Sequence, residues 1–191
     1  MYQKYQTDAI VVGSRESGEA DKSLALYTRD FGLVRARATS VRSEKSKMRY
    51  ALQSFARANV ALVRGKSGWR AAGASASTTT VGKDGAGVSA FARISELVTK
   101  LVAGEDHNEY LFDAIAEAHT ALMREHVESV ATIEIVAVAR ILFALGYLSA
   151  EALQTALFTH TAYAEPHLRE AEVIQDELLL SINKALSQTH L

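Results

Sequence analysis

The stretch RARATSVRSEKSKMR, residues 35–49, concentrates side chains that could bind phosphate. It holds six cations against one acid, Glu44. Lys and Arg side chains on a nucleic-acid backbone displace condensed counterions, and this release favours binding. The alternative is an ordinary solvated sheet face, because a charge run alone is weak evidence for a ligand. The candidate phosphate-binding residues in the stretch are Arg35, Arg37, Arg42, Lys45, Lys47 and Arg49.

The first part of the stretch alternates as a strand does. The face that carries Arg35 and Arg37 is opposite a small apolar face, made of Val34, Ala36 and Ala38. The Ser- and Lys-rich run that follows has no apolar period, which indicates a loop. The pattern therefore predicts a basic strand face that continues into a basic loop.

Four further segments with strand patterns surround this one. Strands are predicted over residues 8–15, 23–29, 33–41, 55–64 and 69–76, with a hairpin turn at GKSG, residues 65–68. Five short strands with a long excursion between the third and fourth suit a small closed barrel, which leaves no free sheet edges. We predict an α+β protein, with a five-stranded OB-type β-barrel over residues 1–77 and an all-α helical bundle after it.

An OB-type barrel binds single strands on one open face and its neighbouring loops. The last hairpin and the fifth strand add Arg64, Lys66 and Arg70 to the candidate nucleic-acid-binding residues. Trp69 and Tyr50 are possible base-stacking platforms, since every base offers a π-face. The alternative is core packing, which is the usual role of a lone Trp in a small barrel.

Residues 78–87 are polar and glycine-rich, which predicts a linker. The helical domain is expected over residues 88–191. Ser89 is the predicted cap of its first helix, and Gly146 is predicted to stop the apolar central helix over residues 129–145. Pro166 suits a first helical turn. Helices are expected over residues 89–101, 108–122, 129–145, 149–157 and 168–187.

Charge divides the chain in the same place. Residues 1–72 hold 14 Lys and Arg against 6 Asp and Glu, a net of +8, whereas residues 73–191 hold 7 against 16, a net of −9. The overall net charge of −1 conceals this division. Such a split indicates two units with different partners, unless it arose by chance.

No convergent catalytic set is recognisable, so we expect no enzyme, no cofactor and no metal. The chain has no cysteine, which excludes disulfides and thiolate ligands. His119 and His126 are interpreted as surface histidines, and acids such as Glu105 and Asp106 as solvated. No apolar run reaches the roughly 20 residues of a membrane helix, and the start lacks a signal peptide, so cytoplasm is the expected location.

Residues 8–70 resemble the N-terminal domain of the bacterial RecO family of recombination mediators in DNA repair. No single motif is specific, but their order and spacing together are. The motifs are GEAD (18–21), TRDFG (28–32), SK (46–47) and LQSF (52–55). In the second half, YLF (110–112) and RILFALGY (140–147) match the helical domain of the family more loosely.

The resemblance implies an OB-fold followed by a helical domain. It also implies binding of single- and double-stranded DNA, annealing of complementary strands, and loading of RecA together with RecR on DNA coated with the single-strand-binding protein SSB. Relatives bind the acidic SSB C-terminal tail on their helical domain. Many carry a four-cysteine zinc module, which this chain lacks, and a reduced helical domain is expected here.

Two other functions remain open from the residues alone. The barrel could be an RNA-binding OB module, or the basic face could meet an acidic protein in an interaction scaffold.

Overall fold

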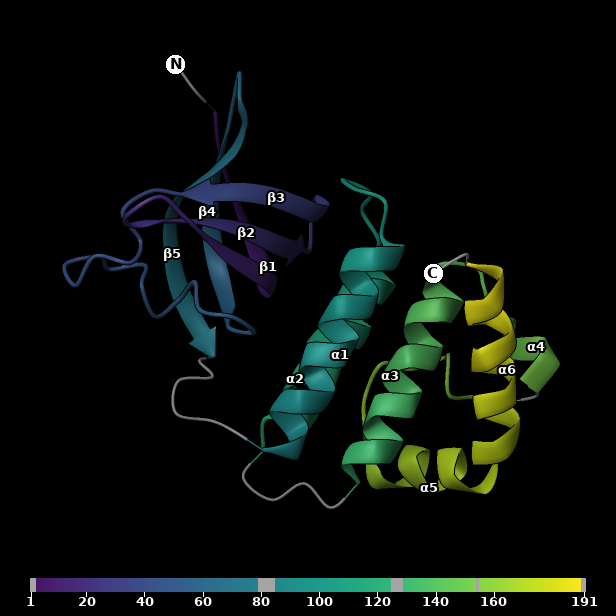
Figure 1. The fold of residues 1–191 in the computed structure, drawn as a ribbon. Helices are drawn as coiled ribbons and strands as arrows, with labels where there is room; N and C mark the ends of the chain where they lie inside the picture. The colour runs from purple at the N-terminus through teal and green to yellow at the C-terminus, as the bar shows by residue number, and fades with distance from the viewer. Residues whose placement is uncertain (1–2, 79–84, 125–128, 154, 190–191) are drawn as a thin grey trace. The chain divides into compact units, whose positions relative to one another are not determined.

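The computed structural model describes residues 3–78, 85–124, 129–153 and 155–189. The chain forms two compact units, each built from its own elements (Figure 1). The first comprises residues 1–83 together with 103–108, and the second comprises residues 84–102 and 109–191.

The first unit is a closed five-stranded barrel with the strand order β1-β2-β3-β5-β4. Every neighbouring pair is antiparallel except β3 and β5, which run parallel over a short stretch. This arrangement confirms the predicted OB-type barrel. The strands are β1 Lys4–Ser17, β2 Asp21–Thr28, β3 Gly32–Ala38, β4 Arg57–Gly65 and β5 Gly68–Thr78.

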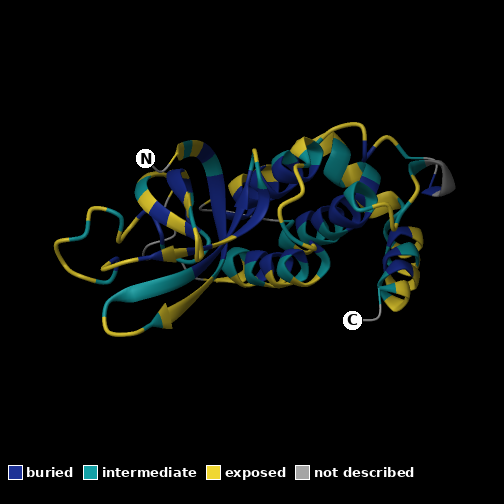
Figure 2. Ribbon diagram, turned by 90° about the horizontal axis from the view of Figure 1, so that it is seen from above, coloured by how far each residue is buried: buried dark blue, intermediate teal, exposed yellow. Residues whose placement is uncertain are grey.

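The barrel core is filled by alternate side chains of its strands, as the two-residue period predicts. In β3, Val34, Ala36 and Ala38 are buried in this core, whereas Arg35 and Arg37 are exposed on the outside. The same alternation of buried and exposed residues is visible along the strands in Figure 2. The predicted basic outer face of β3 is therefore confirmed.

The long connection between β3 and β4, residues 39–56, contributes to the core although it contains no helix or strand. Val41, Ala51 and Leu52 are buried and belong to the same hydrophobic cluster as the strands. Met48 packs against that cluster. The connection is consequently anchored at apolar positions while its cations remain outside.

The turn between β2 and β3 is held by one side chain. Thr28 Oγ1 donates to the carbonyl oxygen of Gly32 at 2.9 Å and accepts the N–H of Phe31 at 3.0 Å. Gly32 has φ of 64°, a left-handed conformation that glycine adopts without strain. These contacts explain the spacing of the TRDFG motif.

Residues 103–108, which join two helices, belong to the barrel unit. The Leu33 N–H donates to the carbonyl oxygen of Gly104 at 3.1 Å. A Cβ at Gly32 would lie 2.2 Å from the carbonyl oxygen of Asp106. Burial raises the pKa of the Tyr27 phenol, and the Asp106 carboxylate raises it further. This docked loop was not predicted from the sequence.

The second unit is helical, as predicted. α3 is its central helix and contacts α1, α2, α5 and α6. At its end, Gly146 has φ of 79°, and the Tyr147 N–H donates to the carbonyl oxygen of Leu142 at 2.8 Å, which is a Schellman stop. The helices are α1 Ala86–Leu101, α2 Glu109–Leu122, α3 Val130–Ala144, α4 Ala150–Leu153, α5 Glu165–Val173 and α6 Gln175–Gln188.

A buried arginine organises the segment after α4. The Arg140 side chain is fully buried and donates to the carbonyl oxygens of Leu157, Thr161 and Ala162 at 3.0, 2.7 and 3.1 Å. Its guanidinium also lies 4.6 Å from the ring centroid of Tyr163. The helix predicted over residues 149–157 is too long: α4 ends at Leu153, and the Ala156 N–H donates to Glu170 Oε1 at 3.1 Å in place of a helical carbonyl.

Two other helix predictions are corrected. Ser89 lies within α1, not at its cap, and its Oγ donates to the carbonyl oxygen of Gly85. The helix predicted over residues 168–187 is two helices that meet at Ile174, with Ala171 of α5 and Leu178 of α6 both buried. Pro166 stands in the first turn of α5, as expected.

Two smaller predictions, on His119 and on the linker, are also corrected by the structure. His119 is completely buried, not on the surface, with its ring at 79° to Phe91 and the centroids 5.0 Å apart. His126 lies outside the described residues. The predicted linker is shorter than expected, because β5 ends at Thr78 and α1 begins at Ala86. None of the described helices has the length and apolar character needed to cross a bilayer.

Candidate nucleic-acid interface

Arg35 projects from the outer face of β3 beside small neighbours. In the register of the sheet it is opposite Ala25 of β2, which is in turn opposite Gly13 of β1. Arg35 is exposed, and it forms no ion pair with any other described residue. A guanidinium on such a flat surface is open to a phosphate approaching along the strands.

Arg37 stands one step along β3, in a row of arginines that crosses four strands. Arg15 of β1 is opposite Ser23 of β2, Ser23 is opposite Arg37, and Arg37 is opposite Arg70 of β5. All three arginines are exposed, so the row runs round the outside of the closed barrel. We call Arg15, Arg35, Arg37 and Arg70 the arginine row. Arg15 was missed by the sequence analysis, because only the β1–β2 register brings it there.

Arg37 forms an ion pair with Asp21 of β2 on the outer surface of the barrel. Its Nε and an Nη both donate to Asp21 Oδ2, at 3.0 and 2.7 Å, and Asp21 Oδ1 accepts the Ser40 N–H at 2.7 Å. The backbone N–H and the guanidinium hold the pKa of the Asp21 carboxyl below its usual range. The Arg37 side chain is still 65% exposed, so the pair fixes its position without hiding it.

Arg42 has a structural role in this conformation. It forms an ion pair with Glu16 at 3.1 Å and donates to the carbonyl oxygens of Gly18 and Glu19 at 3.4 and 3.1 Å. These bonds tie the connection to the β1–β2 turn. Arg42 is therefore less open to a phosphate than Arg35.

The remaining cations of the connection divide into two groups. Lys45 and Lys47 are exposed on the connection itself. Arg49 lines a groove of about 680 Å³ between the connection and the β1–β2 hairpin, together with Lys22, another cation that the sequence analysis missed. The groove also holds acids, so it is mixed in charge. Its lining residues are Glu16, Glu19, Ala20, Lys22, Val41, Arg42, Ser43, Arg49, Gln53 and Ser54.

The β4–β5 hairpin carries the last predicted cations. Lys66 and Arg70 line one hollow of about 200 Å³ beside Val63. Arg70 thus links this hairpin to the arginine row. Arg64 is exposed too, but it is paired with Glu105 at 3.1 Å.

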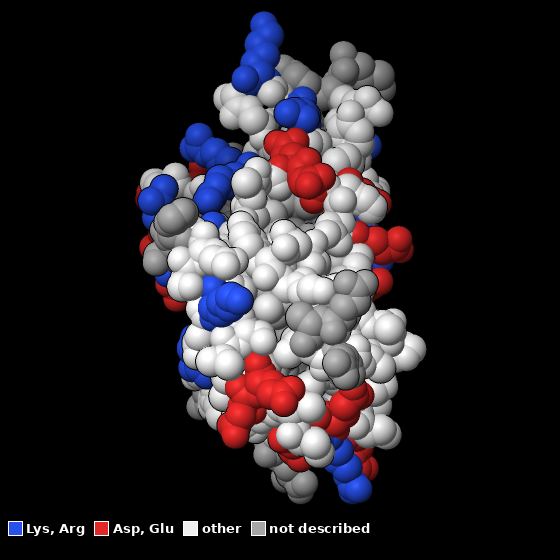
Figure 3. Space-filling view, turned by 90° about the vertical axis from the view of Figure 1, so that its right-hand side faces the viewer, with Lys and Arg blue, Asp and Glu red and all other residues white. Residues whose placement is uncertain are grey.

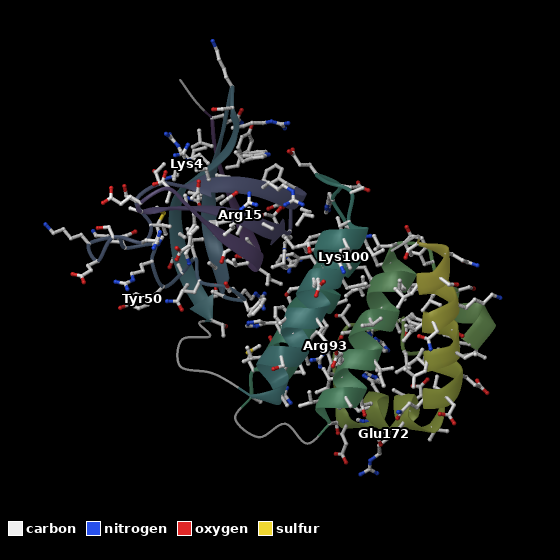
Figure 4. The ribbon with its side chains drawn as sticks, viewed as in Figure 1. Lys4, Arg15, Tyr50, Arg93, Lys100 and Glu172 are labelled. Carbon is white, nitrogen blue, oxygen red and sulfur yellow. The ribbon has the colours of Figure 1, made fainter. Side chains whose placement is uncertain are left out.

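The two candidate stacking residues lie in opposite environments. Trp69 is 7% exposed and belongs to the core cluster, where it contacts Tyr5 and Phe31 edge-on or tilted. This burial favours the packing role over base stacking. Tyr50 is 58% exposed, on the connection at the periphery of the barrel (Figure 4), and its ring is available to a base.

Acidic residues do not form a single surface in the view of Figure 3. Asp and Glu side chains there make several separate groups, with Lys and Arg side chains between them. Among the described residues, no group of three His, Cys, Asp or Glu side chains is placed to hold a metal ion.

The motifs that shape this surface also match known proteins. The family model for the N-terminal part of recombination protein O matches residues 1–70, which include β1 to β4 and only the first three residues of β5. The chain is therefore similar to the RecO family over its first 70 residues.

Several curated proteins named DNA repair protein RecO are similar to this segment. The protein of Desulfitobacterium hafniense is 44% identical over 63 residues, which are 33% of this chain and 23% of that protein. Those of Pelotomaculum thermopropionicum and Dehalococcoides mccartyi are 44% and 45% identical over 62 residues, which are 32% of this chain and 24% of each relative. The chain thus matches about a quarter of the length of these RecO proteins.

Proposed function

We propose that this chain is a recombination mediator in DNA repair. Its barrel would bind single- and double-stranded DNA, anneal complementary strands, and act with RecR to load RecA on SSB-coated DNA in the cytoplasm. The observation that carries the proposal is the arginine row on a domain of the RecO N-terminal type. The names of the relatives, which are DNA repair proteins, favour DNA over RNA.

The arginine row supports contacts to phosphate, not to base edges. Arginine guanidinium groups pair well with phosphate oxygens, and such contacts position a strand without reading its sequence. The small neighbours of Arg35, Ala25 and Gly13, leave room for a backbone to lie against the sheet. A strand held by its phosphates keeps its bases free to pair, which is what annealing requires. We infer that Lys45, Lys47, Lys66 and the Tyr50 ring extend this contact.

The helical unit offers a candidate site for the SSB tail. A groove of about 550 Å³ lies between α1 and α6, with the side chains of Leu97 and Leu186 in its lining. Arg93 and Lys100, both on α1 (Figure 4), flank it. Their acidic partners are Glu134, at 2.6 Å with a side chain 21% exposed, and Glu96, at 2.8 Å and well exposed. An acidic peptide with an aromatic end fits this combination of apolar lining and cations.

An annealing assay tests the proposal. The intact chain should accelerate annealing of complementary oligonucleotides, and the double variant Arg15→Ala, Arg35→Ala should lose most of that acceleration. Arg169→Ala is the matched control, because it removes a guanidinium from α5 of the helical unit. Acceleration on SSB-coated strands should also fall in Arg93→Ala. No acceleration by the intact chain, or equal acceleration by the barrel variant, would count against a mediator.

The choice of polymer is tested separately. Unlabelled RNA and single-stranded DNA of the same sequence should compete for the barrel, with DNA the stronger competitor. A clear advantage of RNA would instead support an RNA-binding OB module.

A further inference from the structure

One carboxylate of the barrel unit occupies a site with two nitrogen donors. The Trp69 Nε1–H donates to Glu105 Oε1 at 2.9 Å, and an Nη of Arg64 lies 3.1 Å from Glu105 Oε2. The Arg64 guanidinium also lies 5.2 Å from the centroid of the Trp69 ring. The two oxygens of one anion are thus shared between an indole N–H and a guanidinium, which is the donor set of an oxyanion site.

The indole half of this site is rigid. The Trp69 ring is held in the core by Tyr5 and Phe31, whose ring centroids lie 5.6 and 5.4 Å away. With the ring fixed, its N–H points to one place and must find an acceptor there. The donor is therefore preorganised for any oxyanion that takes the position of Glu105.

The anionic half is replaceable. The side chains of Arg64 and Glu105 are 62% and 37% exposed. Exposed ion pairs contribute little to stability, and their attraction is screened by salt. A phosphate group could displace the carboxylate without opening the core, because only the Glu105 side chain has to turn away.

We propose that Arg64 and the Trp69 N–H form a phosphate subsite for a nucleic-acid strand, which Glu105 occupies in the unbound protein. This proposal rests on the proposed function. It adds a phosphate-binding site, and it names Glu105 as the group that competes with the phosphate. A nucleic-acid phosphate is favoured over an acidic peptide because a further cation, Lys66, follows in the adjoining β4–β5 turn. The Trp69 ring stays in the core and stacks on no base.

The variant Glu105→Gln isolates the charge. Its amide oxygen can still accept from the indole N–H, while the competing negative charge is gone. Binding of labelled oligo(dT), followed by fluorescence anisotropy at low salt, should tighten roughly fivefold, about what one unit charge at close range in water provides. When Arg64 is also replaced by alanine, Glu105→Gln should raise the affinity much less: the change in log affinity should be under half of that in the unmodified background. Glu177→Gln on α6 is the matched control and should leave binding unchanged.

Trp69 is the only tryptophan of the chain and reports directly on the site. Its emission should shift when oligo(dT) replaces Glu105 in the unmodified protein. Equal affinity of the unmodified protein and Glu105→Gln would overturn the subsite while leaving the proposed function intact. Binding of the strand by neither protein would overturn both. A glutamate-rich peptide that displaces the strand from Arg64, and not from an Arg64→Ala variant, would overturn the nucleic-acid assignment.

Discussion

Replacing Arg35 by alanine tests the phosphate contacts at the position where the structure makes the cleanest case. The side chain is exposed, has small neighbours in Ala25 and Gly13, and forms no ion pair with the other described residues. Its removal should leave the fold almost unchanged, within about 0.5 kcal/mol of the unfolding free energy. Any loss of affinity for the strand can then be attributed to the lost contact between Arg35 and a phosphate.

The expected size follows from counterion release. Each phosphate contact contributes about 0.9 to the slope of log affinity against log salt concentration. Between about 50 and about 200 mM salt, one such contact therefore weakens binding by a factor of about 3.5. At low salt, Arg35→Ala should bind the strand more weakly than the unmodified protein. Over this salt range its affinity should fall by a factor that is about 3.5 times smaller than for the unmodified protein.

The assay is anisotropy of a labelled single strand at four or more salt concentrations, with Arg169→Ala of α5 as the control. Because phosphate contacts do not read sequence, strands of different composition should lose affinity alike. An unchanged slope in Arg35→Ala, with an unchanged affinity, would refute the assignment of Arg35. A loss confined to one base composition would indicate contacts to bases.

Three further predictions concern stability. Arg140→Met should lower the unfolding free energy by about 2–4 kcal/mol in urea titrations, because one buried and two partly buried carbonyl groups lose their donor; a change below about 0.5 kcal/mol would contradict this role. Burial raises the pKa of Tyr163 to about 12, so the folded state resists ionisation and its stability should fall as pH rises above about 10. Tyr163→Phe should reduce that loss of stability at alkaline pH. An identical pH profile of stability in this variant would show that the Tyr163 phenol does not cause the loss. Gly32→Ala should lower the melting temperature, since its Cβ would lie 2.2 Å from the carbonyl oxygen of Asp106; an unchanged melting curve would show that the loop yields freely.

The barrel was predictable because its signals are local. Alternation in β3 places Arg35 and Arg37 outside and Val34 and Ala36 inside, and each of these positions is confirmed. The Schellman stop at Gly146 is equally local, since glycine is the residue that this conformation favours.

The features that sequence missed depend on distant partners. Arg15 joins the arginine row only through the strand register, and no pattern near it indicates that position. Glu105 was interpreted as solvated, because nothing in its own segment shows that it meets Trp69 and Arg64. The burial of Arg140 likewise depends on carbonyl groups 17 to 22 residues further along the chain, which no pattern around Arg140 indicates.

Chemical-shift mapping of the intact chain with oligo(dT) tests the central claim most directly. If phosphates lie along the arginine row, backbone amide signals of β1, β3 and β5 near Arg15, Arg35 and Arg70 should move as the strand is added, and those of α6 should not. Shifts confined to the helical unit, or none at saturating strand, would contradict a nucleic-acid interface on the outer face of the barrel.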